Sequence, residues 1–164
     1  MIGKTMQDAM NEQINKEFFS SYLYLSMAAY FEDKNLTGFG HWMRLQADEE
    51  REHAMKFYEF IIERGGQVVL KAIEAPATQW NSNLELFREV ATHEAKVTAS
   101  INALYELALA EKDYPAQVML QWFINEQVEE EKNAAEIVAN LELIEERGTA
   151  VLMLDHRLAK RGGE

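Results

Sequence analysis

Four long segments of this chain repeat apolar residues at the spacing of an α-helix, and very little interrupts them. The 164 residues include two prolines and eight glycines, and neither proline lies in the interior of a periodic segment. Since an α-helix tolerates glycine and proline least, the pattern predicts long unbroken helices. Apolar residues make up 48% of the chain, enough to bury a core in one domain of this length. We therefore expect a single all-α domain over residues 1–164.

Residues that favour helix ends mark the limits of these segments. Gly65 and Gly66 follow the second segment, as glycine commonly does at a helix C-terminus. Ser82 and Glu85 form a Ser-x-x-Glu capping box at the start of the third segment. Pro115 suits the first turn of the fourth. We expect four long helices and a short fifth helix, at about residues 5–33, 39–64, 82–111, 115–147 and 149–160.

The lengths of the connections predict how these helices are arranged. The first and second helices have a short link, and so do the third and fourth, so each pair should be antiparallel. The link between the second and third helices runs from about Gln67 to Asn81, which is long enough to travel the length of a bundle. Two antiparallel pairs joined by one long crossover form a four-helix bundle of the ferritin-like type, here over about residues 5–147.

Three of the expected helices carry a glutamate inside the apolar stripe, near mid-length. Glu17 lies on the inner face of the first helix, Glu50 at the centre of the stripe of the second, and Glu94 within that of the third. An unpaired carboxylate buried in such a stripe would cost several kcal/mol. A bound cation offers a common cause, because coordination neutralises the carboxylates and lets the fold bury them.

The spacing of Glu50 and His53 adds geometry to this hypothesis. At positions i and i+3 of one helix, the carboxylate and the imidazole project side by side and can bind the same ion. Such ligands suit iron or manganese. The chain has no cysteine, which excludes thiolate metal sites and iron–sulfur clusters. Glu-x-x-His is an element of di-iron carboxylate bundles.

The acidic run 125-NEQVEEEKN-133 divides between the inside and the outside of the fourth helix. On a helical wheel, Gln127 and Glu130 fall inside the apolar stripe. Glu126 and Glu129 lie along one rim of that stripe, and Glu131 lies on the opposite rim. We expect Gln127 and Glu130 to complete the buried site and Glu131 to be solvated.

Three strings of residues, SSYLYLSMAAYF, HWMRLQADEEREHAMKFYEFIIERGG and LQWFINEQVEEE, resemble those of prokaryotic non-haem ferritins, and the resemblance extends over residues 5–160. Ferritins form a hollow cage of twenty-four subunits. They oxidise Fe(II) at a site inside each subunit bundle and store the ferric product as a mineral. The resemblance therefore implies a self-assembling ferroxidase for iron storage and detoxification, with Fe(II) and dioxygen or peroxide as substrates.

The resemblance also implies a role for each inner residue. Glu17 and Glu94 would each be a terminal ligand of one iron. Glu50 would bridge the two irons, and His53 would bind the first. Tyr24, on the inner face of the first helix, would hydrogen-bond near the site and give an electron or a proton during oxygen reduction.

The fourth helix would supply most of the remaining ligands, and the second helix would add Glu49. By resemblance, Gln127 and Glu130 approach the second iron. Glu49, Glu126 and Glu129, with Glu130, match an extra iron site that lies beside the di-iron centre in bacterial and archaeal members. The fourth helix has no second Glu-x-x-His, which argues against a bacterioferritin, so we expect no haem.

Charge and hydropathy limit the possible partners. The formal net charge of −12 makes nucleic acid and anionic membranes poor partners. The N-terminus lacks the apolar region of a signal peptide, and no run of about 18 or more apolar residues is present, so we expect a cytoplasmic protein. Two alternatives stay open: a non-storing di-iron oxidase or peroxide-detoxifying ferritin-like protein, and a metal-free acidic bundle, which would leave the inward-facing glutamates unexplained.

Overall fold

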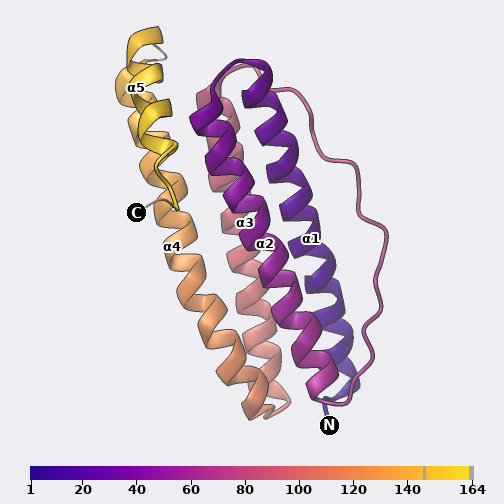
Figure 1. Cartoon of the computed structure of the whole chain (residues 1–164). Helices are drawn as coiled ribbons and strands as arrows, with labels where there is room; N and C mark the ends of the chain where they lie inside the picture. Colours follow the sequence, from indigo (N-terminus) through magenta and orange to yellow (C-terminus); the bar gives the residue numbers. More distant parts are fainter. Residues whose placement is uncertain (146, 163–164) are drawn as a thin grey trace.

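Five α-helices make up the regular structure of the chain. The computed structural model describes residues 1–145 and 147–162, and none of these residues is in a β-strand. Figure 1 shows the helices α1 (Lys4–Asp33), α2 (Thr37–Glu63), α3 (Asn83–Ala110), α4 (Tyr114–Ile144) and α5 (Gly148–Leu158). The prediction of four long helices and a short fifth one is confirmed. Residues 146, 163 and 164 of the predicted domain lie outside the described residues.

Most helix ends lie within about two residues of the limits expected from the sequence. The end of α4 is the exception, since the helix stops at Ile144 and not near residue 147. Its C-cap residue Glu145 has a φ of 50°, the left-handed conformation that commonly ends a helix. At the start of α3, the side chain of Ser82 accepts a hydrogen bond from the backbone N–H of Glu85 at 3.0 Å, as the capping motif predicts.

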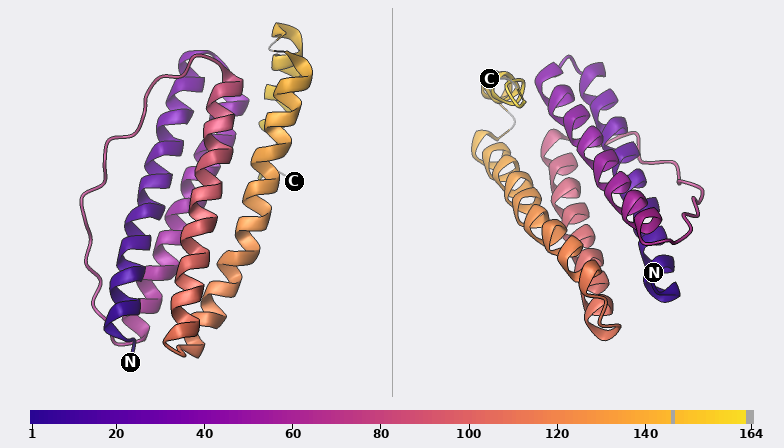
Figure 2. Two further views of the ribbon diagram at one scale, coloured as in Figure 1. Left: turned by 180° about the vertical axis from the view of Figure 1, so that it is seen from behind. Right: turned by 60° about the horizontal axis from the view of Figure 1, so that its bottom comes forward.

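The bundle consists of two antiparallel hairpins, α1–α2 and α3–α4, joined by an extended crossover (Figures 1 and 2). Close backbone contacts are concentrated within each hairpin. The crossover, residues 64–82, runs along the outside of α1 for the length of the bundle (Figure 2). The expected topology, with one long crossover between the second and third helices, is therefore confirmed.

Side chains of α1 hold the crossover in place. The side chain of Asn11 donates to the carbonyl of Gln67 at 3.0 Å and accepts from the N–H of Val69 at 2.8 Å. Further along α1, Ser26 donates to the carbonyl of Ala77 at 2.6 Å. Because an unpaired backbone polar group away from water is costly, these bonds give the crossover the partners that a strand would find in a sheet.

The apolar core is in two parts, one toward each end of the bundle. One part includes Phe31, Phe39 and Phe87, and the other is built around Phe57 and Phe123. On each long helix, buried polar residues separate the two parts at mid-length. Within the described residues, no helix has the length and apolar character needed to cross a membrane.

Helix α5 packs against α2 and α4 at one end of the bundle (Figure 2). Its residue Asp155 supplies a cap for α2, since Asp155 Oδ1 accepts a hydrogen bond from the N–H of Phe39 at 2.9 Å. Among the described residues, Leu36 at the N-cap position makes no side-chain capping bond. The carboxylate of α5 therefore satisfies a free N–H group in the first turn of α2.

The close approach of α5 to Gly38 leads to a testable prediction. A Cβ atom at Gly38 would lie 1.8 Å from the carbonyl oxygen of Asp155, which is a backbone atom and cannot turn aside. We expect Gly38→Ala to destabilise the protein by about 2 kcal/mol, because α5 must shift to relieve the overlap. Guanidinium unfolding of the purified variant measures this loss.

Gly148→Ala is the matched control for that variant. Among the described residues, no atom lies within 4 Å of a Cβ placed at Gly148. Because alanine favours a helix over glycine by up to about 1 kcal/mol, this variant should be as stable as the parent or slightly more so. Equal unfolding midpoints for the Gly38 and Gly148 variants would contradict the proposed packing of α5.

Candidate metal centre

A layer of buried polar side chains crosses the bundle between the two parts of the apolar core. All four long helices contribute to it, and every member is at most 4% exposed. The members are Glu17 and Tyr24 from α1, Glu50 and His53 from α2, Glu94 from α3, and Gln127 and Glu130 from α4. The sequence placed each of these residues on an inner face, and the structure brings them into one layer.

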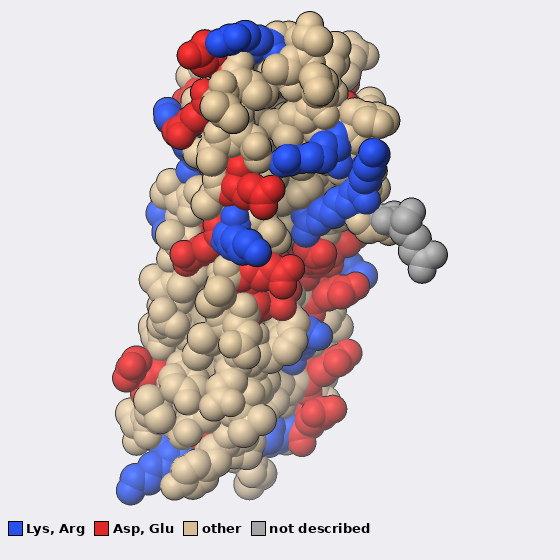
Figure 3. All heavy atoms as spheres, turned by 90° about the vertical axis from the view of Figure 1, so that its left-hand side faces the viewer, with Lys and Arg blue, Asp and Glu red and all other residues tan. Residues whose placement is uncertain are grey.

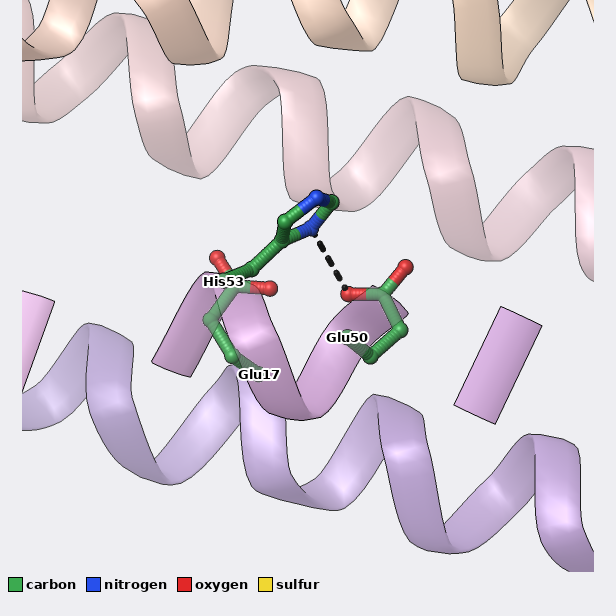
Figure 4. A group of neighbouring side chains, drawn as sticks. All are labelled: Glu17, Glu50 and His53. Atoms are coloured by element: carbon green, nitrogen blue, oxygen red, sulfur yellow. Dashed lines mark ion pairs between the residues drawn. The ribbon is translucent and has the colours of Figure 1, made fainter. Parts of the chain in front are cut away.

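Glu17, Glu50 and His53 form the tightest part of this layer. One potential ligand atom from each side chain lies within 4.8 Å of the other two, an arrangement that can hold one metal ion (Figure 4). His53 Nδ1 lies 3.4 Å from Glu50 Oε2. The i, i+3 spacing on α2 aims both side chains at Glu17 on α1, so the predicted pairing of carboxylate and imidazole is present.

The ring of His53 is held between aromatic neighbours. Trp122 and Phe123 of α4 both meet it edge-on, with ring centroids 5.4 and 5.8 Å away. The second nitrogen of the ring, Nε2, lies 4.0 Å from Glu126 Oε1. One nitrogen therefore faces the buried layer and the other faces the rim.

Two buried glutamines that the sequence analysis did not single out hold three of the carboxylates. Gln13 Nε2 donates to Glu17 Oε1 at 2.7 Å. Gln46 Nε2 donates to Glu130 Oε2 at 2.8 Å, with a longer contact of 3.4 Å to Glu50 Oε1. Gln13 precedes Glu17 by four residues, and Gln46 precedes Glu50 by four. This shared i, i+4 spacing is the sequence signal that could have identified both.

Gln127 and Tyr24 hold the fourth carboxylate. Gln127 Nε2 lies 3.2 Å from Glu94 Oε2, and the hydroxyl of Tyr24 donates to Glu94 Oε1. Burial raises the pKa of Tyr24 well above its ordinary value, and the charge of Glu94 adds to the effect. The phenol is therefore neutral near pH 7. Because Gln127 turns its nitrogen toward Glu94, ligation of a metal through its carbonyl oxygen stays a prediction.

Burial sets the charge state of the four carboxyl groups. It raises the pKa of Glu17 well above its ordinary value, with repulsion from Glu50 as the next cause. Burial followed by the charge of Glu94 does the same for Glu50. Burial also raises the pKa of Glu94, and it raises the pKa of Glu130 to about 7, again with a contribution from Glu94. Without a cation, the layer is stable only when it binds protons.

Two oxygens of the layer have no hydrogen-bond partner among the described residues. They are Glu17 Oε2 and Glu50 Oε2, both completely buried. In native proteins nearly all buried acceptors are satisfied, so two free oxygens facing one cluster indicate a missing partner. Several carboxylate oxygens with one imidazole form a donor set that suits a divalent cation such as iron or manganese. The residues present therefore fit a metal centre.

Three further glutamates predicted to bind metal lie at the rim of the layer. The side chain of Glu126 is 28% exposed, that of Glu49 is 42% exposed, and Glu129 is exposed. Glu49 and Glu129 line one surface pocket of about 490 Å³ between α2, α4 and the residues after α5. Figure 3 shows acidic side chains gathered beside basic ones on the face formed by α4 and α5. Glu131 is exposed, as predicted.

The rim is not purely acidic, because a cation from the chain reaches it. Arg161 Nη2 donates to Glu49 Oε2 at 2.6 Å. The sequence analysis assigned no role to Arg161. The predicted extra metal site, which needs Glu49, therefore shares a ligand with an arginine that follows α5.

Comparisons with known proteins found relatives that match almost the whole chain. A family model described as a ferritin-like domain matches residues 7–144. A bacterial non-heme ferritin from Bacteroides fragilis is 42% identical over 161 residues, covering 98% of this chain and 100% of the relative. A bacterial non-heme ferritin from Staphylococcus haemolyticus is 37% identical, covering 98% of this chain and 97% of the relative.

A solved structure is similar over the same length. It is an open pore ferritin from the hyperthermophilic archaeon Archaeoglobus fulgidus, with a TM-score of 0.97 and 49% sequence identity. The match covers 98% of this chain and 99% of that chain. The similarity thus includes α5 as well as the four-helix bundle.

The raised pKa of Glu130 predicts how the metal-free protein responds to pH. The folded state keeps a proton on this carboxyl up to about pH 7, whereas the unfolded chain releases it near the ordinary value of 4.5. Folding stability should therefore fall as the pH rises through this window. Glu130→Gln removes the group, so the variant should gain up to about 3 kcal/mol relative to the parent between pH 5 and pH 8.

Guanidinium unfolding at the two pH values, with a chelator present, measures that difference. Glu131→Gln is the control, because Glu131 follows on the same helix but is exposed. For Glu131→Gln, we expect the same difference from the parent at both pH values. A Glu130→Gln variant that behaves like this control would show that Glu130 is not the buried acid described here.

Proposed function

The chain belongs to the ferritin family, and from this premise we propose that it stores iron by oxidising Fe(II) at the buried centre of each subunit. The observation that carries the proposal is the layer of four buried carboxylates and one imidazole, in which Glu17 Oε2 and Glu50 Oε2 accept no hydrogen bond from the described residues. Ferrous ions as substrate would supply the positive charge that this layer needs.

Two ferrous ions would bind across the two hairpins. We assign Glu17 and His53 to the first ion and Glu94 and Glu130 to the second, with Glu50 between them. The positions support this, since Glu50 contacts His53 at 3.4 Å and shares the amide of Gln46 with Glu130. Gln127 would approach the second ion after its amide rotates.

The oxidation itself is a transfer of one electron from each ferrous ion. The pair of electrons, with two protons, reduces dioxygen to hydrogen peroxide or peroxide to water, and the ions leave as Fe(III). Binding the ions displaces the protons that the raised pKa values keep on the layer. Tyr24 would give a proton or an electron during this step, a role that its hydrogen bond to Glu94 supports.

Glu49, Glu126 and Glu129 would form, with Glu130, an outer site for an iron ion in passage. Their partial exposure supports this role, because a carboxylate in contact with water can release an ion more readily than a buried one. The distance of 4.0 Å between His53 Nε2 and Glu126 Oε1 supports passage of an ion between the outer site and the inner one.

Storage also requires many copies of the chain. We propose that copies assemble into a closed cage, with twenty-four subunits as the expected number. Apolar side chains that a single copy leaves open support assembly. On α1 and the crossover they include Tyr22, Leu25 and Leu70, each at least half exposed. Tyr22 and Leu25 are three residues apart on α1 and so lie on one face of the helix, and contiguous exposed apolar groups are typical of surfaces that other subunits cover.

Aerobic addition of Fe(II) to the assembled protein tests the proposal. We expect Glu50→Ala/His53→Ala to slow the initial oxidation by roughly 10- to 100-fold, because it removes two adjacent ligands. The parent should elute from size exclusion as a large assembly that carries ferric absorbance. Glu52→Ala is the control, since Glu52 lies on the same helix but is exposed and should leave the rate unchanged.

Two results would contradict the proposal. An unchanged oxidation rate in the double variant would show that the buried layer is not the oxidation site. A parent protein that oxidises iron without retaining it in a large assembly would favour the non-storing oxidase or peroxide-detoxifying enzyme.

The outer site gives a separate prediction. In Glu129→Ala we expect two ions per subunit to bind as in the parent, because the buried ligands are intact, while the third ion is lost. Calorimetric titration with Co(II), which avoids oxidation, counts the ions. Loss of all binding in this variant would show that the division between inner and outer sites is wrong.

A further inference from the structure

The chain returns to the metal centre after α5 ends. Arg161 lies against three residues on one face of α2, at positions 42, 46 and 49. Arg161 Nη1 donates to Gln46 Oε1 at 2.8 Å, and Nη2 donates to Glu49 Oε2 at 2.6 Å. The guanidinium stacks over the ring of Trp42, 4.5 Å from its centroid. Together with a bond of 2.9 Å between His41 Nε2 and the carbonyl of Arg161, these contacts fix the arginine in place.

The contact with Gln46 is the one that reaches the buried layer. The side chain of Gln46 is 1% exposed, and it has an oxygen at one end of the amide and a nitrogen at the other. Arginine can only donate hydrogen bonds, so it can bond only to the oxygen of the Gln46 amide. The nitrogen end must then point at Glu130 and Glu50, where it lies 2.8 Å and 3.4 Å from their oxygens. Arg161 thereby sets the orientation of the amide.

Consecutive hydrogen bonds, here from Arg161 to Gln46 and from Gln46 to the two glutamates, strengthen one another. The bond from a charged guanidinium is a charge-assisted one, and it polarises the amide so that its N–H groups become better donors. The carboxylates of Glu130 and Glu50 receive this effect without contacting the arginine. An amide held from one side also loses the freedom to rotate and present its oxygen to the carboxylates.

We propose that Arg161 is a positioning residue of the metal centre, which acts through Gln46 to hold Glu130 and Glu50 in the geometry that binds metal. The inference rests on the proposed metal centre. It makes the affinity of that centre depend on the residues after α5, which lie far from the layer in the sequence.

The opposite side of the layer has a similar arrangement, built without the chain end. Gln13, which donates to Glu17, accepts a hydrogen bond from Ser100 Oγ at 2.6 Å, and Lys16 Nζ donates to the same Ser100 at 2.6 Å. Each of the two glutamines thus has its oxygen fixed from outside and its nitrogen directed inward. The anchor of Gln13 lies within the bundle, whereas that of Gln46 comes from beyond α5.

Co(II) binding to the metal-free assembly tests the proposal without relying on iron oxidation. We expect Arg161→Ala to weaken the two inner ions by about 3- to 10-fold and to change the visible absorption of bound Co(II), since outer groups tune the geometry of ligands. Arg161→Lys should retain part of the affinity, because lysine can donate to Gln46 but cannot also hold Glu49. Arg157→Ala is the control, since Arg157 lies in the last turn of α5, close to Arg161 in the sequence, and is paired with Glu136 at 3.6 Å.

A double-mutant cycle separates action through Gln46 from action through Glu49. If Arg161 acts through Gln46, then Arg161→Ala/Gln46→Met should bind Co(II) no more weakly than Gln46→Met alone. Losses that simply add in the double variant would instead place the action of Arg161 outside Gln46, at its other contact with Glu49. Methionine has nearly the volume of glutamine, so Gln46→Met should preserve the packing. If Arg161→Ala assembles poorly, Arg161→Lys can replace it in the cycle.

Two outcomes would overturn the inference. They are an unchanged Co(II) isotherm in Arg161→Ala and strictly additive losses in the cycle. A parent assembly that binds no Co(II) at all would instead refute the metal centre itself. Failure of this inference and failure of the proposed function are therefore distinguishable.

Discussion

The burial of four carboxylates in one layer is the constraint on which the rest of this structure depends. Glu17, Glu50, Glu94 and Glu130 lie where apolar side chains would be more stable, and their mutual repulsion adds to the cost of burying them. The chain offsets part of this cost with amide and phenol donors that contact at least one oxygen of each group. Glu17 Oε2 and Glu50 Oε2 accept no hydrogen bond from the described residues, and we propose that a cation binds them.

The two parts of the apolar core offset the free-energy cost of burying this layer. Aromatic clusters around Phe31 and Phe39 on one side and around Phe57 and Phe123 on the other stabilise the bundle independently of the layer. The stability of the helices therefore depends less on the middle of the bundle. The polar layer lies at mid-length, and each long helix has apolar packing on both sides of it.

Much of this arrangement could be predicted from the sequence, because the evidence for it is local. A glutamate inside an apolar stripe is visible on one helical wheel, and the i, i+3 pair of Glu50 and His53 needs only one helix. The helix ends were also predictable where glycine or a capping serine marks them. The early end of α4 was not predictable, since Glu145 adopts a left-handed conformation that glutamate does not favour.

The partners of the ligands were harder to predict for a physical reason. Gln13 and Gln46 resemble ordinary polar residues in the sequence. The i, i+4 spacing of Gln13 and Glu17 is visible there, whereas the bond from Gln46 to Glu130 joins two helices that only the fold brings together. Arg161 was out of reach, because its contact with Gln46 joins residues separated by more than a hundred positions. This contact forms only when α5 packs against α2, so no periodic pattern in the sequence predicts it.

The division of the ligands between the hairpins has a consequence for the energetics of the whole subunit. Glu17, Glu50 and His53 belong to the first hairpin, and Glu94 and Glu130 belong to the second, with the crossover as the only covalent connection. Ions shared between them would act as a reversible cross-link in a chain that has no cysteine. Because the assembled site exists only in the folded subunit, ions bound there would stabilise the folded state by mass action. Loading and release of the cargo would then tighten and relax the subunit, as formation and reduction of a disulfide do in other proteins.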